Sequence, residues 1–152
     1  MDKKIEDIII GQWSLVEMFI EFDSGERIYP NGKKAIGQLI YLENGIMSAQ
    51  IGNTERTKSK INDYRAVDKD FTFDNYKEYI SYFGTYEVID SKKYITHEVR
   101  MSLFPNWIGQ RVKRYFKIRH MDGVAILTLR ATKIKVDGEL GVPTIVWEKI
   151  NA

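Results

Sequence analysis

Two polar residues, His97 and Arg114, fall where an alternating pattern otherwise places apolar side chains. Over residues 94–103, the side chains that share the parity of His97 are apolar: Ile95, Val99, Met101 and Leu103. Over residues 112–118, those that share the parity of Arg114 are also apolar: Val112, Phe116 and Ile118. Because side chains alternate between the two faces of a strand, both polar residues are predicted to point into an apolar interior.

Together these two residues predict a polar spot inside an apolar cavity, because a buried charge is costly unless it is paired or hydrogen-bonded. Histidine changes its charge near neutral pH, so His97 is the candidate catalytic residue, as a general acid or base, or else a ligand contact. Two structural alternatives stay open. His97 would be a core histidine satisfied by a carbonyl or a tyrosine, and Arg114 would reach water at a barrel end or stack on Trp13.

Further ligand contacts are expected from aromatic, amide and apolar side chains of the same predicted interior. With His97 and Arg114, the expected contacts are Tyr82, Trp107, Asn106, Trp13, Tyr41 and Met101. The alternative for the aromatic members is that they form plain core, since aromatic side chains dominate core burial.

Motifs for other chemistries are absent from the sequence. It has no cysteine, and its two histidines, His97 and His120, form no metal-binding spacing. There is no glycine-rich phosphate loop and no Gly-x-Ser-x-Gly nucleophile motif. We therefore expect neither a metal nor a cofactor.

The composition predicts one globular domain spanning residues 1–152, with 43% hydrophobic and 29% charged residues. A net charge of +2 is too small for a dedicated nucleic-acid binder. The densest basic cluster favours a solvated strand face and comprises Arg111, Lys113, Arg114, Lys117 and Arg119. No apolar run approaches the roughly 20 residues needed to cross a bilayer, and residues 1–7 do not resemble a signal peptide. We expect a cytoplasmic protein without a membrane or nucleic-acid partner.

Most of the chain alternates with a period of two, which predicts strands. The expected strands are 11–22, 36–42, 46–51, 85–89, 94–104, 111–120, 124–132 and 142–150. Asn44-Gly45 predicts a hairpin in which both turn residues adopt positive φ. Sequential antiparallel strands with tight turns predict an all-β fold, a closed up-and-down barrel of about 8–10 strands.

One short helix is predicted over 71–83, because Phe73, Tyr76, Ile80 and Phe83 recur at three- and four-residue spacing. Gly84 is expected to be its left-handed C-terminal cap. A helix this short is not stable alone, so we expect it to lie against the sheet. The preceding stretch 52–70 is polar and is predicted to be a lid, a functional loop or a mobile segment, with a short strand at 64–67 as an alternative.

Several motifs carry a family resemblance across residues 11–149. They are Gly11-Gln12-Trp13, the runs 41–50 and 79–86, Trp147-Glu148-Lys149 and, most specific, the run 96–107 that contains Ser-Leu-Phe-Pro-Asn-Trp. With these the chain resembles the bacterial lipocalin-like domain family. The resemblance implies a closed barrel with an internal cavity, and some distant relatives act as cyclases. Where secreted lipocalins pack a last-strand arginine over the first-strand tryptophan, this chain offers Lys149.

Three functions follow from these observations. The leading one is a binding module that holds a small hydrophobic ligand inside the barrel, oriented by His97, Arg114 and a tyrosine or Asn106. The second is an isomerase or cyclase on a hydrophobic, natural-product-like substrate, with His97 as general acid or base and Tyr82 or Arg114 stabilising an oxyanion. The third is a structural homodimer without a ligand, so a monomer and a homodimer both stay open.

Overall fold

The computed structural model describes residues 3–151, in which strands predominate. The strands are β1 (Gly11–Phe22), β2 (Arg27–Ile28), β3 (Ile36–Tyr41), β4 (Ile46–Gly52), β5 (Tyr79–Ile89), β6 (Tyr94–Ser102), β7 (Arg111–Met121), β8 (Val124–Ala131), β9 (Ile134–Val136) and β10 (Glu139–Lys149). The helices are α1 (Ile5–Ile9) and α2 (Lys69–Lys77), with 3-10 turns η1 (Asp90–Lys92) and η2 (Pro105–Trp107). None of the helices in this range is long and apolar enough to cross a membrane.

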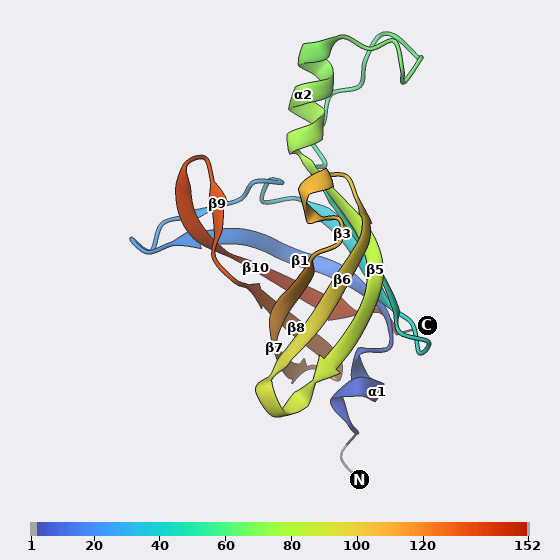
Figure 1. Cartoon of the computed structure of the whole chain (residues 1–152), viewed down its shortest axis with the longest axis vertical. Coiled ribbons are helices and arrows are strands. Elements are labelled where there is room, and N and C mark those ends of the chain that lie inside the picture. Colours follow the sequence, from blue (N-terminus) through green and yellow to red (C-terminus); the bar gives the residue numbers. More distant parts are fainter. Residues whose placement is uncertain (1–2, 152) are drawn as a thin grey trace.

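Eight of these strands close into an antiparallel barrel in the order β1-β3-β4-β5-β6-β7-β8-β10. The last strand returns to the first, with Trp13 opposite Lys149 and Phe22 opposite Gly141. The short strands β2 and β9 pair with β1 and β10 and extend the sheet at its margins. Figure 1 shows the barrel strands wrapping around a common interior. The prediction of a closed antiparallel barrel of eight to ten strands is therefore confirmed.

Helix α1 lies at one end of the barrel (Figure 1) and was not predicted from the sequence. Its side chains Ile5 and Ile9 are buried, and the indole Nε1 of Trp13 donates to the Ile9 carbonyl over 2.8 Å. The Nζ of Lys149 lies 5.5 Å from the centre of the Trp13 ring. The cation that packs on Trp13 is therefore Lys149 of the last strand. Arg114 does not stack on Trp13 but lines the cavity described below.

Residues of positive φ form the hairpin turns, and one turn differs from its prediction. Asp137 and Gly138, between β9 and β10, both adopt positive φ, at 48° and 88°. In the β3–β4 turn only Gly45 does so, at 86°, so the expectation for Asn44 is wrong. The Asn44 side chain instead accepts a hydrogen bond from the Ile46 amide, and the Leu42 amide closes the turn by donating to the Ile46 carbonyl.

The predicted helix over 71–83 is shorter and lies elsewhere than expected. It spans Lys69–Lys77, buries no side chain, and projects beyond the barrel end opposite α1 (Figure 1). Tyr79 and the residues after it belong to β5, because Tyr79 fits against Gly52 of β4, where a Cβ would lie 2.9 Å from the ring. The loop before α2 is exposed, and residues 64–67 form no strand there.

A bulge between β5 and β6 changes which side chains face inward. Phe83 pairs with Met101 but Gly84 pairs with Val99, so Arg100 is an extra residue on β6. Gly84 is therefore a close-approach residue within a strand and not a helix cap, since a Cβ there would lie 1.8 Å from the Glu98 carbonyl oxygen. The extra residue reverses the alternation, which turns Met101 outward and contradicts its predicted inward position.

Candidate functional site

A cavity of about 390 Å³ occupies the barrel interior. Its walls are mainly apolar and include Met18, Ile20, Leu39, Ala49, Ile51, Ile80, Val99, Val112, Leu129 and Ile145. Four exposed residues also line it: Lys77, Gln110, Thr132 and Lys133. Lys77 ends α2, Gln110 follows η2, and the other two residues precede β9. These elements lie at the barrel end opposite α1 (Figure 1), so the cavity reaches the surface at that end.

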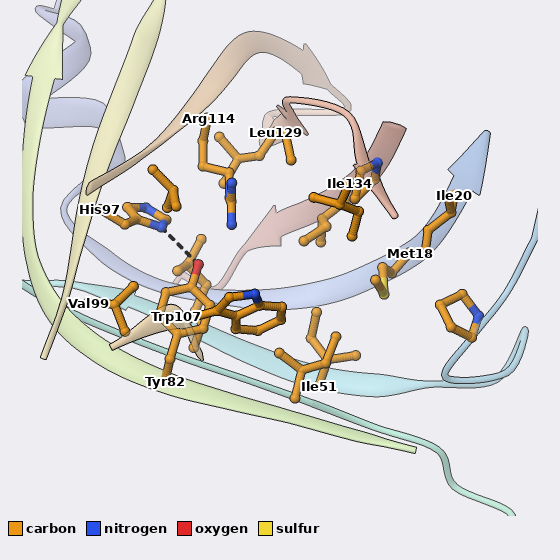
Figure 2. Close-up of a pocket in the computed structure, with 18 of the residues that line it drawn as sticks. Met18, Ile20, Ile51, Tyr82, His97, Val99, Trp107, Arg114, Leu129 and Ile134 are labelled. Carbon is orange, nitrogen blue, oxygen red and sulfur yellow. Dashed lines mark hydrogen bonds between the residues drawn. The ribbon is translucent and has the colours of Figure 1, made fainter. Parts of the chain in front are cut away.

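His97 is held between two tyrosines within the barrel. Its Nε2 lies 2.7 Å from the hydroxyl oxygen of Tyr41, and its Nδ1 lies 2.8 Å from that of Tyr82. All three side chains are buried, with His97 1% exposed. His97 is thus bonded as a core histidine would be, yet both His97 and Tyr82 line the cavity, where Figure 2 shows the bond between them.

Burial keeps this histidine neutral. Loss of solvation lowers the pKa of His97 well below its ordinary value of 6.5, and the positive charge of Arg114 lowers it further. Burial likewise raises the pKa of Tyr41 well above its ordinary value of 10.0. Near neutral pH, therefore, Tyr41 and His97 supply hydrogen bonds to the site and no charge.

Hydrogen-bond accounting assigns the protons along this chain of three residues. A neutral imidazole has one donor and one acceptor nitrogen. Tyr41 is fully buried, and within residues 3–151 its hydroxyl has His97 as its side-chain partner. If that hydroxyl accepted from the ring, its own hydrogen would be buried without an acceptor, which is costly. Tyr41 therefore donates to Nε2, Nδ1 donates to Tyr82, and the Tyr82 hydrogen is free to point into the cavity.

Arg114 brings a positive charge to the same part of the cavity. It lies on β7, is half-buried, and extends into the cavity beside His97 (Figure 2). Its guanidinium donates over 3.3 Å to the carbonyl of the adjacent Lys113. No carboxylate among residues 3–151 lies within salt-bridge distance of it. The charge is therefore open to a ligand.

Two further polar side chains line the cavity without a hydrogen-bond partner among the described residues. They are Asn31, 1% exposed, in which both the amide nitrogen and the amide oxygen are unpaired, and Trp147, whose indole Nε1 is unpaired. Such groups cost free energy when buried, so a partner is expected for them. The sequence gives no signal for Asn31, because Pro30-Asn31-Gly32 is typical of an exposed turn.

The structure brings four of the eight predicted ligand contacts to the cavity: His97, Arg114, Tyr82 and Trp107. Tyr41 lies behind His97 and Trp13 lies beside α1, and neither lines the cavity. Asn106 and Met101 are exposed outside it, Asn106 because it lies on the η2 turn and Met101 because of the β5–β6 bulge. Neither of these last two residues lines the cavity.

The polar end of the cavity presents hydrogen-bond donors. The Tyr82 hydroxyl and the Arg114 guanidinium both offer N–H or O–H groups, and arginine has no acceptor. Such a pair can bind a carbonyl oxygen or a carboxylate, and can stabilise negative charge that develops on an oxygen. The Trp107 indole packs nearly perpendicular to the Tyr82 ring, with 6.3 Å between the ring centres.

The comparison with known proteins agrees with this architecture. Residues 10–150 match the model of a family described as the lipocalin-like domain. No curated protein and no solved structure matches the chain at a significant level. The family match runs from the residue before β1 to the residue after β10, so it covers the whole barrel and the cavity within it. The chain therefore belongs to the lipocalin-like domain family.

Proposed function

We propose that this protein binds a small hydrophobic molecule inside its barrel. The observation that carries the proposal is the cavity of about 390 Å³, whose walls are largely apolar and whose interior is reached from one barrel end. Ligand sites are typically clefts of about 300–1,000 Å³ with apolar walls and a few convergent polar groups. Here Arg114 and Tyr82 orient the polar end of the ligand, and His97 holds Tyr82 in place.

Filling the cavity tests this proposal. N-phenylnaphthylamine, a neutral dye that fluoresces in apolar surroundings, is titrated into purified protein from which bound molecules have been extracted. Ala49 is buried and lines the cavity, so Ala49→Phe is expected to weaken binding of the dye at least tenfold. Thr85→Phe adds comparable bulk to an exposed position outside the cavity and is the matched control.

Native mass spectrometry of the unextracted protein, followed by denaturing extraction, then gives the chemical class of any molecule that co-purifies. Equal dye binding by native protein and a folded Ala49→Phe variant would place the dye outside the barrel and contradict the proposal. Near-ultraviolet circular dichroism establishes that the variant is folded. Ala131→Leu, a smaller change at another cavity position, serves if Ala49→Phe does not fold.

A second candidate function is acid–base catalysis on a hydrophobic substrate, as an isomerase or cyclase. The chain of hydrogen bonds from Tyr41 through His97 to Tyr82 favours it, because the chain ends on a hydroxyl that lines the cavity. Tyr82 would pass its proton to a substrate oxygen, and the Nδ1–H of His97 would pass its proton to Tyr82 while Nε2 takes the proton of Tyr41. His97 stays neutral throughout, and Arg114 would stabilise the negative charge left on the chain until the proton returns. His97 would then act through Tyr82 and not by direct contact.

Solvent-proton exchange distinguishes catalysis from binding alone. The co-purifying compound is incubated with the protein in heavy water, and deuterium at its carbon atoms is measured by mass spectrometry. Tyr82→Phe is expected to abolish incorporation while the compound still binds, and Tyr94→Phe, on the barrel but not lining the cavity, leaves it unchanged. Bound compound that never gains deuterium would exclude the enzyme and leave the binding module.

A further inference from the structure

The charged side chains that line the cavity are all positive. Within the described residues they are Lys77, Arg114 and Lys133, and no aspartate or glutamate accompanies them. Lys133 is neutralised by Asp23, with 2.9 Å between Nζ and the carboxylate oxygen. Arg114 has no such partner within residues 3–151. A half-buried guanidinium without a counter-ion favours a ligand that supplies negative charge.

The neighbouring hydroxyl strengthens this preference for an anion. The proton assignment leaves the Tyr82 hydrogen pointing into the cavity, so Tyr82 and Arg114 act there as donors. An uncharged hydroxyl could accept one of these hydrogen bonds, whereas a carboxylate accepts several at once and offsets the charge. The polar group expected beside Arg114 is therefore a carboxylate.

A second polar position lies at the other side of the cavity. The turn that carries Asn31 follows β2, where Ile28 pairs with Ile20, and it is closed by the Gly32 amide bonding to the Tyr29 carbonyl. Figure 2 shows Ile20 across the cavity from His97 and Arg114. The turn of Asn31 follows the strand that pairs with Ile20, so we infer that this turn lies on the far side. Leu129, Ile51 and Met18 are apolar lining residues that Figure 2 shows between His97 and Ile20.

Asn31 needs a partner that can both donate and accept. Its side chain is 1% exposed, lines the cavity, and has an unpaired donor and an unpaired acceptor within the described residues. Both atoms are satisfied together by a hydroxyl, a primary amide or a protonated acid. An apolar ligand terminus at this position would leave the amide unpaired in the complex as well.

We propose that the ligand is a two-headed acid, with a carboxylate on Arg114 and Tyr82, an apolar middle, and a hydroxyl or amide on Asn31. This inference rests on the proposed function, since both polar groups belong to one molecule in the one cavity. It separates the ligand from simple hydrophobes, which have no group for Asn31, and from cationic amphiphiles, which Arg114 repels.

Displacement of N-phenylnaphthylamine by matched competitors tests it. The competitors are dodecanol, dodecanoic acid, and terminal hydroxy acids of increasing length from hydroxyoctanoic to hydroxytetradecanoic acid. Dodecanoic acid is expected to compete about tenfold better than dodecanol, as for a hydrogen bond to a charged group. At the chain length that spans the cavity, the hydroxyl should improve competition by a further factor of about five.

Two variants assign these gains to their residues. Arg114→Met keeps the apolar stem and should remove the advantage of the acid over the alcohol, while Arg119→Met, exposed on the same strand, should not. Asn31→Leu is close to isosteric and should remove the gain from the terminal hydroxyl, while leaving dodecanoic acid unaffected. Asn62→Leu makes the same change at an exposed position outside the cavity.

The outcomes separate this inference from the function on which it rests. If the dye does not bind, or Ala49→Phe binds it as well as native protein does, the proposed function itself fails. If the dye binds in the cavity but alcohol and acid compete equally, the carboxylate assignment is wrong. If hydroxy acids of every length compete no better than the plain acid of the same length, Asn31 takes no part and the two-headed ligand is excluded.

Discussion

At His97, burial and a neighbouring cation act in the same direction on the proton. Both lower its pKa well below the ordinary value of 6.5, so the native protein takes up this proton at lower pH than the unfolded chain does. The free energy of unfolding contributed by His97 is therefore complete above about pH 6.5 and decreases as the pH falls below it. The decrease is at most about 1.4 kcal/mol per pH unit.

We predict that His97→Gln removes this pH dependence, because glutamine does not titrate. Urea unfolding of native protein and variant at several pH values between about 7 and 5 measures it. His120→Gln makes the same change at an exposed position outside the cavity and is the matched control. Parallel curves for native protein and His97→Gln would mean that His97 takes up its proton equally in the folded and unfolded states, against its burial.

The Asn31 amide is expected to aid ligand binding but to lower the free energy of unfolding of the ligand-free protein. Its buried amide has no partner among the described residues, which costs about 1–3 kcal/mol. We predict that Asn31→Leu raises the free energy of unfolding of the ligand-free protein by about that amount, as measured by urea titration. Asn62→Leu should stay within about 0.5 kcal/mol of native protein. A destabilised Asn31→Leu would instead assign the amide a structural role.

At the scale of elements, the strands could be predicted from alternation and the turns from their glycines. β1 was predicted with its observed bounds. For β7, the prediction identified the side chains that face the interior, Arg114 among them. This succeeds because burial on one face of a strand leaves a period-two pattern in the sequence. The sequence left a carbonyl, a tyrosine or a ligand open as the hydrogen-bond partner of His97. It could not choose among them, because local sequence does not encode which side chains meet across different strands.

The errors arise where the alternation is interrupted or absent. Residues 79–83 mix apolar side chains at both helical and strand spacing, and pairing with β4 decides for the strand. Met101 was misplaced because a bulge inserts Arg100 and nothing in the sequence of β6 marks it. Asn31 was missed because a turn carries no periodicity. Cavity residues on loops are therefore not predicted by alternation, and Trp107, on η2, was expected from its aromatic side chain instead.

The bulge itself gives a prediction at this scale. At Gly84 an added Cβ would lie 1.8 Å from the Glu98 carbonyl oxygen, and backbone must move to admit it. We predict that Gly84→Ala lowers the free energy of unfolding by about 3 kcal/mol or more, as in severe overpacking. Thermal unfolding followed by circular dichroism measures the change, with exposed Thr85→Ala as the control. A near-native melting temperature for Gly84→Ala would show that β5 and β6 lie further apart than described.

At the scale of the whole molecule, the cavity and the closed barrel depend on each other. The walls come from strands along the whole length of the chain, and the barrel closes only when β10 pairs with β1. The unfolded chain therefore has no equivalent site. A ligand that binds only the native state raises stability by about 2.7 kcal/mol at a concentration of one hundred times Kd.

We predict that dodecanoic acid at this saturation raises the melting temperature by about 5–10 °C, since 1 kcal/mol corresponds to about 2–4 °C for a chain of this size. Differential scanning calorimetry of extracted protein measures the shift. Arg114→Met should reduce it at equal concentration of the acid, because the variant binds the acid more weakly, while Arg119→Met should match native protein. If dodecanoic acid lowers the melting temperature of native protein, it binds the unfolded chain. If Arg114→Met shows the same rise in melting temperature as native protein, the carboxylate does not contact the Arg114 guanidinium. Because each shift depends on the closed barrel as well as on one side chain, this measurement tests the site and the fold together.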